Sequence, residues 1–283
     1  MKILVAGLGI IGGSIALSLK KAGYAVDGWN RSARAAEYAL GRKIVDNIAE
    51  DFTIYDVVFV AMPPRATVEF IENNAFKDGA VVSDICGVKK PIEAAICSKY
   101  RNFSYVGLHP MAGKEISGIE AACDYLFNHA SMVIAVNENT DKAALALMEK
   151  LAADMGFGRI VECSAEVHDR KIAYTSQLAH VVSNAYVKDE DLACCLGFTG
   201  GSFQDMTRIA GVDENVWTEL YIANKDNLSQ KISSLIDSLG RIKQAVEDGN
   251  AGELSEILAE GRKLYENCKK IASDDDISVK KLR

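Results

Sequence analysis

This chain has few of the residues that build metal centres and disulfide frameworks. Its four histidines are His109, His129, His168 and His180, and they do not stand at the spacing of metal ligands. Its seven cysteines include no Cys-x-x-Cys pair, and an odd number of scattered thiols is typical of reduced cytoplasmic proteins. We therefore predict a cytoplasmic protein that holds no metal.

The sequence also lacks long apolar runs and blocks of basic residues. No run is long and apolar enough to cross a bilayer, and the formal net charge of the 283 residues is -7. These features argue against a membrane or a nucleic acid as a partner. A chain of this length can bury a large core and divide into two domains.

What the sequence does contain is a glycine fingerprint near its beginning. Residues 2–6 form a short apolar run that predicts a strand, and residues 13–22 have helical character. Between them, the first glycine makes a tight turn, the second lets the backbone approach a pyrophosphate, and the third lets the helix pack on the strand. The phosphates would then bind the N-terminal amides of the helix. The predicted dinucleotide-binding residues are Gly7, Leu8, Gly9, Ile10, Ile11 and Gly12.

The end of the second predicted strand, residues 25–29, indicates which cofactor this fingerprint binds. A site that prefers NAD places a carboxylate here to accept hydrogen bonds from the ribose hydroxyls. This chain has Asn30 instead, and the next residues, Arg31, Ser32 and Arg34, add positive charge and a hydroxyl donor. Such groups suit a 2′-phosphate, so we predict NADP rather than NAD. The alternative is that the two arginines are solvated charges at a helix start, where they oppose the helix dipole.

Apolar strands alternate with helical stretches through the first half of the chain. Further strands are predicted at residues 57–61, 80–84, 105–109 and 132–136. This alternation predicts an α/β fold with a doubly wound parallel sheet of the Rossmann type. Ligands of such sheets bind beyond the carboxyl ends of the strands. The residues at those ends, which we expect to line one crevice beside the cofactor, are Met62, Pro63, Asp84 and His109.

The second half of the chain has the periodicity of helices. Residues 165–188 and 212–249 read as helical, and residues 254–271 follow after a turn. One heptad seam consists of Leu228, Ile232, Leu235, Leu239, Ile242 and Val246. Two such seams on one helical hairpin are typical of a homodimer core.

These patterns divide the chain into three parts. We predict a Rossmann domain over residues 1–163 and an all-helical dimerisation domain over residues 164–272. The polar tail, residues 273–283, is expected to fray.

One histidine stands in an unusual setting. His109 follows the apolar residues 105–108 and precedes Pro110, which keeps the histidine in an extended backbone. The chain then enters a loop at residues 111–113. This arrangement predicts a histidine aimed at a substrate that lies beside a nicotinamide.

Four motifs occur in order along the chain, at residues 7–12, 109–118, 176–180 and 200–208. The last three contain His-Pro-Met-Ala-Gly, Ser-Gln-Leu-Ala-His and Gly-Gly-Ser-Phe-Gln-Asp-Met-Thr-Arg. With these motifs the chain resembles the prephenate/arogenate dehydrogenase family of tyrosine biosynthesis over nearly its whole length. The resemblance implies oxidative decarboxylation of prephenate or arogenate with hydride transfer to NADP. It also implies a homodimer whose helical domain completes the active site.

The resemblance further implies roles for individual residues. His109 would bind the C4 hydroxyl of the cyclohexadienol and take its proton, which suits a side chain whose ordinary pKa lies near working pH. Arg208 would hold a substrate carboxylate through its planar fork. The other substrate-side residues implied are Glu115, as a gating acid, Ser176, Gln177 and His180.

Each main assignment has a structural alternative. His109 could be a strand-end histidine with satisfied hydrogen bonds, and His180 could belong to a core or an interface. Arg208 could form an ion pair with Asp205, which stands about one helical turn away.

The chain departs from the family pattern at Gly87, where members commonly carry a serine before the Val-Lys pair. The missing hydroxyl puts one hydrogen bond in doubt, worth about 1 kcal/mol, unless Cys86 or a water replaces it. Two other functions therefore stay open, a β-hydroxyacid or imine reductase and a non-catalytic NADP-binding sensor. The choice between prephenate and arogenate, and feedback by tyrosine, are also left open by the sequence.

Overall fold

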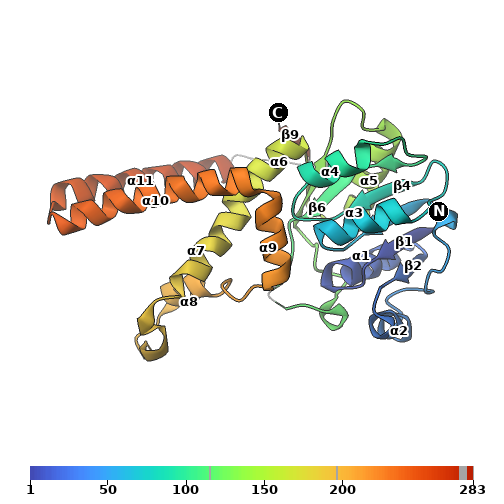
Figure 1. The fold of residues 1–283 in the computed structure, drawn as a ribbon, viewed down its shortest axis with the longest axis horizontal. Helices are drawn as coiled ribbons and strands as arrows, with labels where there is room; N and C mark the ends of the chain where they lie inside the picture. Colours follow the sequence, from blue (N-terminus) through green and yellow to red (C-terminus); the bar gives the residue numbers. More distant parts are fainter. Residues whose placement is uncertain (115, 196, 274–278, 283) are drawn as a thin grey trace.

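The computed structural model describes residues 1–114, 116–195, 197–273 and 279–282. Glu115, the predicted gating acid, lies outside the described residues. The molecule consists of a part built on β-sheets and a helical part. The two parts meet along α6 (Ala165–Ile172) and α9 (Glu214–Ala223) (Figure 1). The division follows the change of pattern in the sequence from apolar strands to amphipathic helices.

The first sheet has five parallel strands in the order β2-β1-β3-β4-β5. Its strands are β1 (Ile3–Ala6), β2 (Val26–Trp29), β3 (Val57–Val60), β4 (Val81–Asp84) and β5 (Ser104–Tyr105). The helices between and after them are α1 (Ile10–Lys21), α2 (Ala33–Gly41), α3 (Pro64–Asn73) and α4 (Lys90–Cys97). All residues of β1 and β3 are buried, as expected for central strands covered on both faces. The predicted Rossmann sheet is confirmed.

A second sheet continues from the first and holds β6 (Gly107–Pro110), β7 (Ser131–Ala135), β8 (Arg159–Cys163) and β9 (Val279–Leu282), with α5 (Lys142–Asp154) between β7 and β8. The strand predicted over residues 105–109 is therefore two strands. Val106 donates the last backbone bond to the first sheet, to Val82 O at 3.1 Å, and β6 then pairs antiparallel with β7. This break places His109 on a different sheet from the cofactor fingerprint.

The end of the chain also differs from the expectation. The tail was predicted to fray, yet β9 pairs parallel with β8. The other neighbour of β8 is β7, so without β9 this edge would present unpaired backbone groups, which bind any available extended segment.

The helical part begins directly after β8. Its helices are α6 (Ala165–Ile172), α7 (Leu178–Tyr186), α8 (Gly201–Thr207), α9 (Glu214–Ala223), α10 (Lys225–Glu247) and α11 (Ala251–Ser273). A π-helical turn, Ala173–Gln177, joins α6 to α7. Single-turn 3₁₀ segments occur at Phe52–Ile54, Ile119–Ala121 and Glu190–Cys194. Within the described part of the chain, no helix has the length and apolar character needed to cross a membrane.

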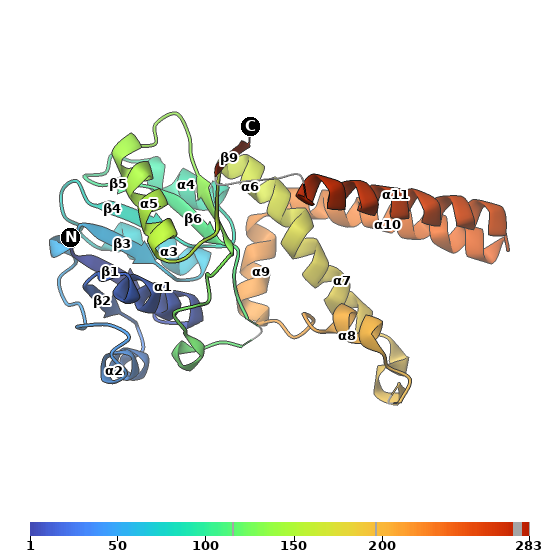
Figure 2. The ribbon, with the colours of Figure 1, turned by 180° about the vertical axis from the view of Figure 1, so that it is seen from behind.

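α10 and α11 lie side by side and project away from the sheets as an arm (Figures 1 and 2). Each helix has 23 residues, which makes the arm roughly 35 Å long. Leu239 and Leu264 are 56% and 63% exposed, and further exposed apolar side chains on the arm are Ile236, Val246, Leu258 and Tyr265. A long apolar surface of this kind marks an interface with another chain.

We expect this arm to hold a homodimer. Replacing both Leu239 and Leu264 by glutamate should place charges in the interface and yield monomers, with the mass in sedimentation falling by half. The control is Gln230→Glu, which adds a charge to the same helix on the side away from the heptad seam. A wild-type chain that sediments as a stable monomer would contradict the prediction.

Candidate functional site

The glycine turn after β1 has the geometry of a dinucleotide loop. Gly7 has φ of +99°, and a Cβ there would lie 2.3 Å from the carbonyl oxygen of Ala61. A Cβ on Gly12 would lie 1.9 Å from the carbonyl oxygen of Gly7, so this position also requires glycine. Nothing lies within 4 Å of a Cβ built on Gly9, and no described side chain caps α1. The first amides of α1 are therefore open to a phosphate.

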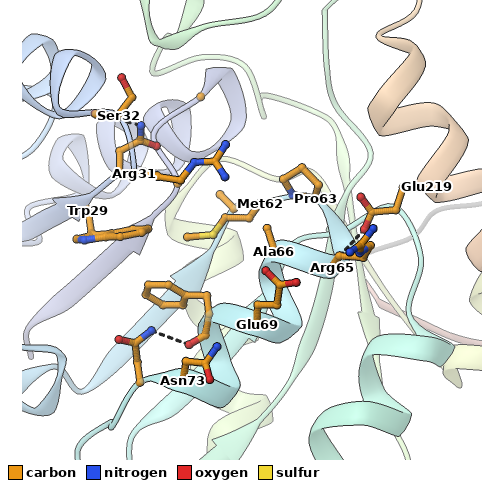
Figure 3. Close-up of a pocket in the computed structure, with 16 residues that line it drawn as sticks. Trp29, Arg31, Ser32, Met62, Pro63, Arg65, Ala66, Glu69, Asn73 and Glu219 are labelled. Carbon is orange, nitrogen blue, oxygen red and sulfur yellow. Dashed lines mark hydrogen bonds between the residues drawn. The ribbon is translucent and has the colours of Figure 1, made fainter.

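A cavity of about 670 Å³ opens beside this turn (Figure 3). Its lining residues are Gly7, Gly9, Trp29, Asn30, Arg31, Ser32, Ala61, Met62, Pro63, Arg65, Ala66, Glu69, Phe70, Asn73, Asn74 and Glu219. The predicted cofactor residues Leu8, Ile10, Ile11, Gly12, Arg34 and Asp84 are not among them. The open glycine, the uncapped helix and the aromatic ring of Trp29 fit a dinucleotide.

Asn30 has a structural task as well as a place in the cavity. Its Oδ1 accepts the N–H of Leu8 at 2.9 Å, and its Nδ2 donates to the carbonyl of Ser32 at 3.3 Å. The side chain therefore ties the end of β2 to the glycine turn. Arg31 and Ser32 follow it and are exposed at the cavity rim.

His109 lies in a second cavity of about 940 Å³. Its lining residues are His109, Pro110, Met111, Ala112, Gly113, Lys114, Ile116, Ser117, Ile172, Thr175, Ser176, His180, Ile209, Gly211, Val212, Asp213, Val216 and Trp217. Met62 and Pro63 line the first cavity instead. The prediction of one crevice with all the strand-end residues is wrong, because β6 belongs to the second sheet.

A chain of hydrogen bonds connects His109 to two buried residues of α6. Nδ1 of His109 lies 2.8 Å from Nε2 of His168, and Nδ1 of His168 lies 2.7 Å from a carboxylate oxygen of Asp169. A carboxylate only accepts, so Nδ1 of His168 carries the proton and its Nε2 is the acceptor. Nδ1 of His109 must then be the donor. This leaves Nε2 of His109 with a free lone pair, as a proton acceptor requires.

Asp169 is itself held by the start of α4. Its two carboxylate oxygens accept the backbone N–H groups of Lys89 and Lys90 at 2.8 and 2.9 Å. Two hydrogen bonds from the first backbone N–H groups of a helix fix the carboxylate in place. Neither His168 nor Asp169 was predicted from the sequence to belong to the site. The sequence feature that could have indicated them is a His-Asp pair near the start of an amphipathic helix.

Asp84 does not face the cofactor cavity, contrary to the prediction. Its side chain is fully buried, and Lys89 Nζ binds one of its oxygens. The hydroxyl of Tyr105 donates to it at 2.5 Å, and the N–H of Cys86 at 2.8 Å. Because these donors surround the carboxylate, Asp84 fixes the loop between β4 and α4 rather than binding a ligand.

Two neighbouring residues of the π-helical turn, both predicted to bind substrate, lie in different surroundings. Ser176 lines the second cavity. Gln177 is buried, where its amide donates to the carbonyl of Leu220 at 3.2 Å and accepts from Asn224 at 2.8 Å. The prediction that Gln177 binds substrate is therefore corrected: it links the π-helical turn to α9 and to the junction of α9 and α10. Such turns insert one extra residue, which rotates neighbouring side chains apart.

His180 belongs to α7, and Arg208 directly follows the last residue of α8. His180 lines the second cavity, its Nδ1 lies 3.0 Å from the carbonyl of Ile209, and its ring centroid is 3.8 Å from that of Trp217. Arg208 is exposed and does not line the cavity, although the next residue does. A role for Arg208 at the substrate would thus need the side chain to turn inward.

The structure gives a packing reason for Gly87. A Cβ there would lie 3.3 Å from a methyl of Leu220 and 3.9 Å from Cε1 of His109. Leu220 therefore fills the space into which a side chain at position 87 would extend. Cys86 does not replace the missing hydroxyl, because its buried thiol contacts Thr67 and the carbonyl of Met62.

Burial controls the protonation of both histidines. It holds the pKa of His109 well below the ordinary 6.5, and the neighbouring His168 and Lys89 lower it further. Burial also lowers the pKa of His168, although the hydrogen bond to Asp169 opposes this. Both rings are therefore neutral at pH 7.

The lowered pKa values predict how stability changes with pH. As the pH falls through 6.5, these histidines take up protons in the unfolded chain but stay neutral in the folded one. The free energy of unfolding should therefore fall as the pH drops below 6.5. The slope should approach about 1.4 kcal/mol per pH unit for each neutral histidine. Urea unfolding at a series of pH values measures it. His109→Asn should reduce the slope, because it removes one of these two rings.

Comparisons with known proteins agree along the chain. The nucleotide-binding domain model of prephenate dehydrogenase matches residues 15–162, and the dimerization domain model matches residues 164–260. The prephenate dehydrogenase of Bacillus subtilis is 30% identical over 270 residues, which cover 89% of this chain and 72% of that protein. The cyclohexadienyl dehydrogenase of Zymomonas mobilis is 27% identical, with 92% and 94% covered.

A solved structure extends the similarity to three dimensions. The prephenate dehydrogenase of A. aeolicus, in complex with hydroxyphenyl propionate and NAD+, superposes with a TM-score of 0.82 at 26% identity. The match covers 95% of this chain and 98% of that one.

Proposed function

The chain belongs to the prephenate dehydrogenase family, and from this premise we propose how its two cavities divide the work of an oxidative decarboxylation. The first cavity binds the nicotinamide dinucleotide and the second binds prephenate or arogenate. The observation that supports this most is the hydrogen-bonded chain from Asp169 through His168 to His109 at the wall of the second cavity. The reductase and sensor alternatives gain no support from the similarities.

His109 accepts the proton of the substrate's ring hydroxyl at Nε2. A dinucleotide bound in the first cavity would supply the acceptor for the hydride of C4, and the substrate would then lose its ring carboxylate as carbon dioxide and become aromatic. His109 suits the task because burial lowers its pKa and keeps the imidazole neutral. The imidazolium that forms gains stability from His168, which can share the charge with Asp169.

On the substrate side, Ser176 and His180 offer a hydroxyl and an imidazole to the polar groups of the substrate. Arg208 would bind a carboxylate after turning inward from the end of α8. Glu115 stays a proposed gating acid. Tyrosine, the end product of the biosynthetic route that this reaction serves, is a proposed feedback ligand. We place the enzyme in the cytoplasm as a homodimer held by α10 and α11.

We propose NADP as the preferred cofactor. Asn30 places a neutral amide where NAD sites have a carboxylate, and Arg31 and Ser32 lie at the rim of the same cavity. The A. aeolicus relative was solved with NAD+, which argues for NAD in that protein. The proposal for this chain rests on its own strand-end residues.

Removal of the proposed base tests the reaction. His109→Asn should lower kcat by roughly a hundredfold or more while dinucleotide affinity stays the same. The acidic limb of kcat/KM in the wild type should lie below pH 6.5, because protonation of His109 there removes the base. His129→Asn, on the surface, is the matched control. Near-full kcat in the His109 variant would refute the role.

Cofactor and substrate choice are measured together, as kcat/KM for prephenate and arogenate with NAD and with NADP. Changing Asn30 to aspartate and Arg31 to leucine adds a repulsion for the 2′-phosphate and removes an attraction. The aspartate can still accept the N–H of Leu8. Discrimination should shift towards NAD by about 2 to 4 kcal/mol. A wild type that already uses NAD better than NADP would show the strand-end argument to be wrong.

A further inference from the structure

α9 is the element that the two cavities share. Val216 and Trp217 line the second cavity, and two residues later Glu219 lines the first. Of the described residues that line the first cavity, Glu219 alone comes from the helical part of the chain. A single helix therefore carries side chains into both proposed binding sites.

Glu219 joins α9 to the nucleotide-binding part through a charged hydrogen bond. Its carboxylate accepts the backbone N–H of Arg65 in the first turn of α3. The N-terminus of a ten-residue helix attracts a negative charge, which strengthens this bond. Figure 3 shows Glu219 and Arg65 at the end of the cavity away from Trp29 and Ser32. Since those two mark the adenosine end, Glu219 stands at the nicotinamide end.

The same helix also contacts residues at the substrate cavity. The ring of Trp217 lies against that of His180, with centroids 3.8 Å apart. Leu220 packs against Gly87, whose added Cβ would touch both Leu220 and His109. A displacement of α9 would therefore change the wall of the substrate cavity and the surroundings of His109.

We propose that Glu219 is a positioning residue that couples dinucleotide binding to the shape of the substrate cavity. A carboxylate has about four acceptor sites, so Glu219 can keep the Arg65 N–H and also accept the hydroxyls of a ribose at the nicotinamide end. The ribose can reach Glu219 only while α9 is docked, that is, while Glu219 accepts the Arg65 N–H. A bound dinucleotide therefore favours the docked position of α9 over any other. The docked α9 then holds Trp217 and Leu220 in place around the substrate. The inference rests on the proposed assignment of the two cavities.

Coupling of this kind is reciprocal, so each ligand tightens the binding of the other by the same factor. The probe is hydroxyphenyl propionate, titrated by calorimetry with and without saturating NADP, and with NAD in parallel. We expect the dinucleotide to tighten binding of the probe at least about fivefold in the wild type. In Glu219→Ala the factor should fall to below about twofold. In Glu69→Ala, which removes a carboxylate of the same cavity that belongs to α3, it should persist.

A second readout uses the chain's two tryptophans, one in each cavity. In a Trp29→Phe background, NADP should change the emission of Trp217 although that residue lines the other cavity, and Glu219→Ala should abolish the change. Glu219→Gln keeps an acceptor for Arg65 and should show an intermediate factor, which also serves if the alanine variant fails to fold. A folded Glu219→Ala that keeps the full factor, or a wild type that turns over but binds the two ligands independently, overturns the inference. A wild type that neither binds a dinucleotide nor turns over refutes the proposed function itself.

Discussion

The candidate active site depends on the hydrogen bonds that the carboxylate of Asp169 accepts. This carboxylate accepts two backbone amides at the start of α4 and the Nδ1 proton of His168. It thereby attaches the first helix of the helical part to the loop after β4, and it sets the tautomer of the histidine that binds His109. Removing the carboxylate would leave the amides unpaired and release the imidazole chain, so stability and chemistry are linked here.

The structure separates the proposed dinucleotide site from the proposed substrate site. The first sheet ends at the glycine turn and the dinucleotide cavity, whereas the break after β5 carries His109 to the second sheet and the second cavity. The buried ion pair of Asp84 and Lys89 stiffens the loop between them. α9 spans both cavities, which allows occupancy of one to influence the other.

The sequence predicted the site best where a motif is local. The glycine turn works through contacts among neighbouring residues, so its position and task follow from spacing alone. The strand-end position of His109 also predicted its place in a cavity, and the family resemblance predicted the sites of Ser176 and His180. Asp84 and Gln177 were wrongly predicted to bind ligands. A polar residue at a strand end or on a helix can instead form hydrogen bonds with buried groups far away in the sequence.

The amino-acid sequence by itself determined the parallel sheet, the dinucleotide turn and the amphipathic helices, because hydrophobic period and glycine placement act over a few residues. Tertiary structure alone decided that His109 leaves the first sheet, that His168 and Asp169 stand behind it, and that the tail adds β9. Each of these depends on pairing between segments far apart in the chain. Local pattern carries no information about which distant carboxylate, amide or strand edge will be the partner.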